Sequence, residues 1–214
     1  QFEIVMDGGL QLEDINKVGV ANLMARMMTQ GTAKKTPQEL EEAIQQLGAS
    51  IAVTARTEDI RITVNTLARN YQATLALVEE ILLEPRWDEK EFALLKQNML
   101  SQIRQQEANP NVVAANAYSK LIYGEKNIRS RNILGTEESV KAITVDDLKT
   151  YYQKNLSPSI ARMHIVGALP KASIDSSLAP LAKKWQAKKV ELSATNPVVA
   201  DAKQAQGKVF FVDI

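Results

Sequence analysis

Two neighbouring runs of alternating apolar and polar residues limit the possible folds of this chain more than any other feature. They are 49–57 (ASIAVTART) and 59–68 (DIRITVNTLA), and they meet at Thr57, Glu58 and Asp59. Alternation with a period of two is typical of half-buried strands. A connection this short predicts a hairpin or adjacent meander strands, because parallel strands need a crossover of about a dozen residues or more.

Helix signals surround this strand pair. In TPQELEEAIQQLG (36–48), Thr36 is the expected N-cap, Pro37 takes the first helical position and Glu39 completes a capping box. Further helices are predicted over 17–29, 70–85, 87–109, 111–124, 136–143, 144–155 and 172–186, and strands over 2–7 and 159–169. This order favours an α+β fold, with helices packed on one face of a largely antiparallel sheet, over a doubly wound parallel fold.

Composition excludes several classes of function. The 214 residues carry 26 basic and 25 acidic side chains, so no overall charge draws the chain to nucleic acid. No apolar run reaches the roughly 18 residues that a membrane span needs. The absence of Cys rules out disulfides, thiolate zinc sites and Cys nucleophiles. No residue of the sequence identifies the cellular compartment. We expect a protein of the bacterial periplasm or one associated with a bacterial membrane.

The two ends suggest a piece of a longer protein. The chain starts inside a strand-like run without an initiator Met, and 208–214 (KVFFVDI) is again strand-like. Residues 188–207 are polar and rich in small side chains, which is typical of a linker. We therefore expect one domain over 1–187, a linker over 188–207, and the start of a further domain at 208–214.

The residues alone do not assemble an enzyme site. Any Ser-His-Asp triad would have to use His164, the single His, which lies in a strand that looks central. A satisfied His in the core or on a sheet face is the favoured interpretation. Phosphate-binding glycine loops are absent from the sequence, and the acidic pairs fall in helices or caps, where solvated faces explain them.

Several motifs in order resemble one peptidase family. The stretch KVGVANLMARMMTQGTAKKTPQELEEAIQQLGASI (17–51) is similar to the signature region of the insulinase/pitrilysin-type zinc peptidases, whose active members carry an inverted H-x-x-E-H helix. The stretch 82–110 resembles the family's long helix with the remaining zinc ligand, and 132–169 resembles its G-T-x-E-S stretch and following strand. The resemblance covers about residues 4–185.

When the family's site residues are placed on this sequence one by one, the resemblance implies a zinc site whose metal ligands and catalytic Glu have all been replaced. Asn22 and Arg26 stand at the two His positions, Ala25 at the catalytic Glu position, and Gln102 at the Glu ligand. Amides are poor zinc ligands and Arg brings a permanent positive charge, so neither zinc nor another metal is expected. Asn22 and Arg26 could form a plain polar helix face; the sharper hypothesis is that Arg26 bonds Gln102, Asn22 or a nearby carboxylate.

The same resemblance suggests what such a domain is for. Proteins that resemble this family are built from four similar α/β domains, or from two chains of two domains, around a peptide-sized chamber. The expectation is a non-catalytic domain without a cofactor, opposite an active zinc-bearing half on the same chain or a sister subunit. Peptide or unfolded protein would occupy the shared chamber. The alternative is a structural core-type subunit, or an interaction module of a larger complex without proteolysis.

Overall fold

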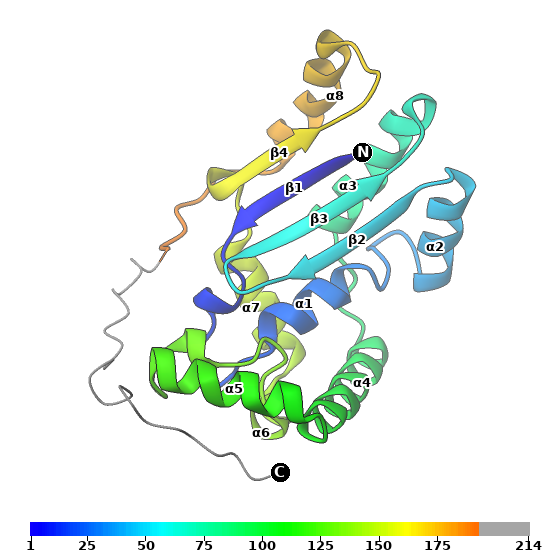
Figure 1. Cartoon of the computed structure of the whole chain (residues 1–214). Coiled ribbons are helices and arrows are strands. Elements are labelled where there is room, and N and C mark those ends of the chain that lie inside the picture. Colours follow the sequence, from blue (N-terminus) through cyan, green and yellow to red (C-terminus); the bar gives the residue numbers. More distant parts are fainter. Residues whose placement is uncertain (193–214) are drawn as a thin grey trace.

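The computed structural model describes residues 1–192, and the strands of that part form one four-stranded sheet (Figure 1). Its order is β2-β3-β1-β4, and each neighbouring pair is antiparallel. The strands are β1 (Phe2–Asp7), β2 (Ser50–Ala55), β3 (Asp59–Asn65) and β4 (Ala161–Ile165). The α+β class with a largely antiparallel sheet is therefore confirmed, and β2 and β3 form the predicted hairpin.

Eight α-helices accompany the sheet in the described part of the chain. They are α1 (Val20–Met28), α2 (Pro37–Gln46), α3 (Tyr71–Leu83), α4 (Glu89–Glu107), α5 (Pro110–Tyr123), α6 (Glu137–Ala142), α7 (Val145–Asn155) and α8 (Lys171–Lys184). Short 3₁₀ helices, which the sequence did not predict, occupy Gly9–Leu12, Ala68–Asn70, Ile128–Ser130 and Pro158–Ile160. Within 1–192, no helix is both long and apolar enough to cross a membrane.

One face of the sheet carries the core. Phe2, Ile4 and Met6 of β1 are almost fully buried and lie opposite the buried Val64, Ile62 and Ile60 of β3. Phe2 meets Tyr71 of α3 edge to face, at 5.6 Å between ring centroids. In Figure 1, α3 and α8 lie behind the sheet, on this apolar side, while α4, α5 and α6 group beyond one end of the strands. Helices thus cover one face, as the period-two pattern requires.

Helix starts follow the predicted caps. Thr36 Oγ1 accepts from the backbone N–H of Glu39, and the Glu39 carboxylate accepts from the backbone N–H of Thr36, so the capping box is confirmed. Asp88 caps α4 by accepting from the backbone N–H groups of Lys90 and Glu91. Asp88 thus caps the helix through its own side chain, without a reciprocal capping box.

The last strand differs from its prediction. Sequence pattern placed a central strand over 159–169, whereas β4 covers only Ala161–Ile165 and pairs with β1 alone, at the edge of the sheet. A 3₁₀ turn that begins at Pro158 delays its start. His164 is exposed on the polar face, so the core interpretation of this residue is wrong and the sheet-face one is right.

The predicted boundary between the domain and the linker, at residues 187 and 188, lies close to residue 192, the last one that the structure describes. Ser157 Oγ accepts from the backbone N–H of Lys188 at 3.0 Å and donates to its carbonyl at 2.9 Å. The chain at Lys188 is thus still bonded to the domain. The predicted linker over 188–207 is described only to residue 192, and the predicted strand at 208–214 lies outside the described residues.

Candidate functional site

The helices α1 and α4 bring the resemblance-derived residues together. Asn22, Ala25 and Arg26 lie on α1, Gln102 lies on α4, and the two helices pack against each other. Arg26 Nη2 donates a hydrogen bond to Gln102 Oε1 at 2.9 Å. The side chain of Arg26 is partly buried, and this burial lowers the pKa of its guanidinium from the ordinary value. The hypothesis of internal bonding by Arg26 to Gln102 therefore holds.

Ala25 and Asn22 complete this site without forming a bonded network. Ala25 is 1% exposed and adds only a methyl group to the packing. Asn22 lies four residues before Arg26 on the same side of α1, and its Oδ1 is buried with no hydrogen-bond partner in the described structure. We call the site formed by Asn22, Ala25, Arg26 and Gln102 the α1–α4 junction. It offers one buried acceptor, one partly buried cation and one exposed amide.

Clustered metal ligands are absent from the described part of the chain. Among residues 1–192, no three His, Cys, Asp or Glu side chains come close enough together to hold a metal ion. The four residues at the α1–α4 junction contain none of these types. They provide two amides, a methyl group and a guanidinium, which bind anions and hydrogen-bonding groups better than cations.

Glu13, which sequence reasoning missed, fixes the start of α1. Its carboxylate accepts from the backbone N–H groups of Gly19 at 2.9 Å and Ala21 at 2.6 Å, at the positive end of the helix. Burial raises the pKa of Glu13 to about 8, against the lowering effect of these two N–H donors. Nearby, Tyr151 donates its hydroxyl to the carbonyl of Gly9 at 2.8 Å. An acidic residue a few positions before a glycine-led helix was the available signal.

The second face of the sheet is polar and bears several ion pairs. We call it the open face; its residues are Glu3, Val5, Asp7, Ser50, Ala52, Thr54, Asp59, Arg61, Thr63, Asn65, Arg162 and His164. Arg61 pairs with Asp59 at 2.8 Å and with Glu3 at 3.7 Å, and Arg162 pairs with Asp7 at 2.5 Å. Val5 is buried although it belongs to this face, because its cross-strand neighbours are the two long arginines.

A sequence profile identifies the family. The profile described as Insulinase (Peptidase family M16) matches residues 1–136, more than half of the chain. The chain belongs to this family. The resemblance seen in the motifs is thereby confirmed.

Relatives of this M16 chain include both a protein described as a non-peptidase and a subunit of a processing peptidase. A "Non-peptidase homolog YmxG" from Helicobacter pylori is 27% identical over 153 residues, covering 72% of this chain and 35% of that protein. A probable mitochondrial-processing peptidase subunit beta from Arabidopsis thaliana is 24% identical over 163 residues, covering 76% of this chain and 30% of the relative. The chain thus spans about a third of the length of these relatives.

Solved structures agree on the fold. A crystal structure of a peptidase M16 inactive domain from Pseudomonas fluorescens superimposes with a TM-score of 0.83 at 21% identity. The superposition covers 89% of this chain and 46% of that one. At this level of identity the likeness establishes the fold: this chain has the architecture of an M16 domain.

Proposed function

We propose that this chain is a catalytically inactive M16 domain that helps to enclose a peptide chamber opposite an active zinc-bearing half. The observation that carries the proposal is the hydrogen bond from Arg26 to Gln102. By resemblance, these residues stand where active members hold the second His and the Glu ligand. In this chain the two side chains bind each other, and a cationic guanidinium occupies the junction instead of groups that attract a cation.

The absence of a catalytic base and of good zinc ligands at these positions supports the same proposal. A catalytic zinc site needs three protein ligands and a carboxylate that activates the metal-bound water. Ala25, at the position of that carboxylate, cannot accept a proton. Asn22 and Gln102 offer amides, which bind zinc far less well than imidazole or carboxylate. Four replacements at one site favour a domain without zinc over an enzyme of altered activity.

The open face is the surface that we assign to the chamber. Its strands are covered by helices on the other side, so this is the broad face of the sheet left for a peptide or a second domain. Arg61 and Arg162 are each already paired with carboxylates there, which lowers the cost of burying their charge in an enclosed space. The partners would be the zinc-bearing half, on the same chain or a sister subunit, and a peptide or unfolded protein between the halves.

Restoring the four residues tests the assignment of the site. A variant with Asn22→His, Ala25→Glu, Arg26→His and Gln102→Glu recreates the ligand types that active members use. We expect it to bind one zinc per chain, measured by elemental analysis after dialysis, and the native chain to bind far less. As a control, the same set with Gln97→Glu in place of Gln102→Glu puts the carboxylate on an exposed position about 140° around α4 from Gln102. Equal zinc in both variants would contradict the assignment.

A second experiment tests the role in the chamber. The chain alone should not cleave peptides, whereas the complete protein or complex with an H-x-x-E-H half should show cleavage that a chelator abolishes. In that complex, Arg61→Glu on the open face should raise KM for a peptide by about threefold or more and change kcat little, since it alters uniform binding. Full association without any metal-dependent cleavage would favour the alternative, a structural core-type subunit.

A further inference from the structure

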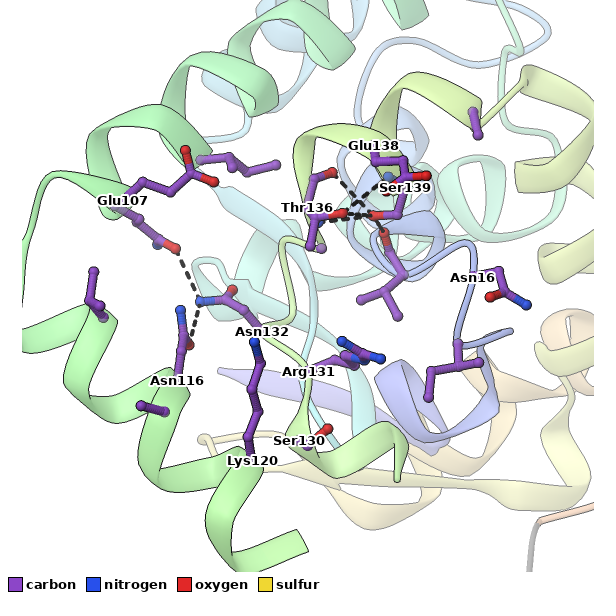
Figure 2. A pocket seen from close by; sticks show the side chains of 18 residues that line it. Asn16, Glu107, Asn116, Lys120, Ser130, Arg131, Asn132, Thr136, Glu138 and Ser139 are labelled. Carbon is purple, nitrogen blue, oxygen red and sulfur yellow. Dashed lines mark hydrogen bonds between the residues drawn. The ribbon is translucent and has the colours of Figure 1, made fainter. Parts of the chain in front are cut away.

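A cleft of about 670 Å³ lies where α4, α5 and α6 meet the loop that follows α5 (Figure 2). Residues Asn22, Ala25, Arg26 and Gln102 do not line it. Gln106, one helical turn after Gln102 on α4, does line it, so the cleft begins beside the α1–α4 junction. Its volume lies within the range of about 300–1,000 Å³ that small-ligand pockets occupy.

A set of three amide side chains forms one wall of the cleft. Asn132 Nδ2 donates to Gln106 Oε1 at 3.1 Å and to Asn116 Oδ1 at 3.3 Å, and Asn132 Oδ1 accepts from the backbone N–H of Leu134 at 2.9 Å. Asn132 therefore uses its hydrogen-bonding capacity to fix its two neighbours. Because the oxygens of Gln106 and Asn116 are engaged, their NH₂ groups are left as donors for a ligand carbonyl.

Two cationic side chains lie on one side of the cleft. Figure 2 shows Lys120 rising from α5 toward Asn132, with Arg131 beside it. Within residues 1–192, Lys120 has no acidic partner at ion-pair distance. Arg131 Nη2 donates to the carbonyl of Glu125 at 3.0 Å, whereas its buried Nε finds no partner in that part of the chain. A buried donor without an acceptor is costly, and a ligand anion beside it reduces that cost.

The remaining lining limits what the anion can be. Ile15, Val18, Ile103 and Val113 give the cleft an apolar surface that suits aliphatic side chains. Glu107 and Glu138 border the cleft on the side away from Lys120 in Figure 2. These carboxylates repel polyanions such as nucleic acids, so the cleft suits a ligand with one negative charge, amide groups and apolar side chains.

We propose that this cleft binds the C-terminal end of a peptide. The free carboxylate lies against Lys120 and Arg131, where two cations form charge-assisted hydrogen bonds with it. The last peptide carbonyls accept from the NH₂ groups of Gln106 and Asn116. Aliphatic side chains of the peptide contact the apolar wall. A peptide is favoured over a simple carboxylic acid because amide donors and apolar surface accompany the cations.

A pair of matched peptides tests this site on the 214-residue chain. The probes are acetyl-Ala-Ala-Leu with a free carboxylate and the same peptide as a C-terminal carboxamide, titrated by calorimetry or NMR. We expect the carboxylate form to bind at least about tenfold tighter. Lys120→Gln should weaken the carboxylate form by about threefold to tenfold and leave the carboxamide form unchanged.

Lys154→Gln provides the matched control, because Lys154 is an exposed helix lysine on α7 that does not line the cleft. Equal affinity for the two peptides, or no binding of either up to about 10 mM, would overturn the proposal. So would an equal loss of affinity in Lys154→Gln and Lys120→Gln. Lys120 is exposed on α5, so its substitution leaves the core intact. The result is independent of zinc, so this proposal and the chamber proposal can fail separately.

Discussion

Arg26 and Gln102 lie seventy-six residues apart in the chain, and their side chains share a hydrogen bond of 2.9 Å between α1 and α4. By resemblance, active M16 members hold zinc between the same two helices. In this chain a cation of the protein itself stands there, which links the sequence changes at Asn22, Ala25, Arg26 and Gln102 to one structural outcome.

A double-mutant cycle measures the bond itself. Arg26→Met and Gln102→Ala each remove one partner, and the coupling between them in the free energy of unfolding should be about 1 kcal/mol. The value is modest because Gln102 is exposed and water competes for the bond. Urea unfolding of the single and double variants gives the coupling. Gln105→Ala, which removes an exposed amide on the same helix, should show none with Arg26→Met.

The raised pKa of Glu13 predicts how the free energy of unfolding depends on pH. Burial raises the pKa of its carboxyl to about 8 in the folded protein, from 4.5 when exposed. Between these pH values the folded chain holds a proton that the unfolded chain has released. The Glu13 contribution to the free energy of unfolding therefore falls as pH rises, by at most about 1.4 kcal/mol per pH unit, and levels off above about 8.

Glu13→Gln removes this titration. The unfolding free energy of the native chain minus that of Glu13→Gln should decrease steadily between about pH 5 and pH 8, measured by urea unfolding at several pH values. Glu125→Gln, at an exposed carboxylate in the loop after α5, serves as the control and should give a flat difference. A flat difference for Glu13→Gln as well would show that Glu13 is ionised across this range.

Two glycines with positive φ should respond very differently to alanine. At Gly135 (φ +78°), an added Cβ would lie 2.1 Å from the carbonyl oxygen of Val18 and 2.6 Å from Ser139 Oγ. At Gly48 (φ +56°), an added Cβ would meet nothing within 4 Å.

Gly48→Ala should therefore cost about 1 kcal/mol for the left-handed conformation alone. Gly135→Ala should cost more than about 3 kcal/mol, because the loop before α1 must also move. Thermal or urea unfolding distinguishes the two. Similar losses for both variants would mean that the contact between Gly135 and Val18 is loose.

The parts of the fold that depend on nearby residues could be predicted from the sequence. The Thr36 capping box and the β2–β3 hairpin each depend on residues only a few positions apart. Strand order depends on distant pairing, and this is why His164 was placed in a central strand although β4 lies at the edge. A run such as 159–169 contains the same alternation in either position.

The candidate sites, like the fold, contain parts that the sequence could predict and parts that it could not. The spacing between Arg26 and Gln102 could be inferred through the family resemblance, whereas the partner of Arg26 stayed open between Gln102, Asn22 and a nearby carboxylate until the structure showed Gln102. The peptide cleft could not be inferred, because its wall combines Gln106, Asn116 and Asn132 from three separate segments. Glu13 was missed because its partners are backbone N–H groups, so the only sequence signal was the weak one of an acidic residue a few positions before the helix.

The most direct test of the central claim is the zinc content of the native 214-residue chain. The purified chain is incubated with excess zinc, dialysed and measured by elemental analysis. The absence of zinc ligands at Asn22, Arg26 and Gln102 predicts a content far below one zinc per chain, unchanged by Gln102→Ala. One tightly held zinc per chain that is lost on Gln102→Ala would contradict the account.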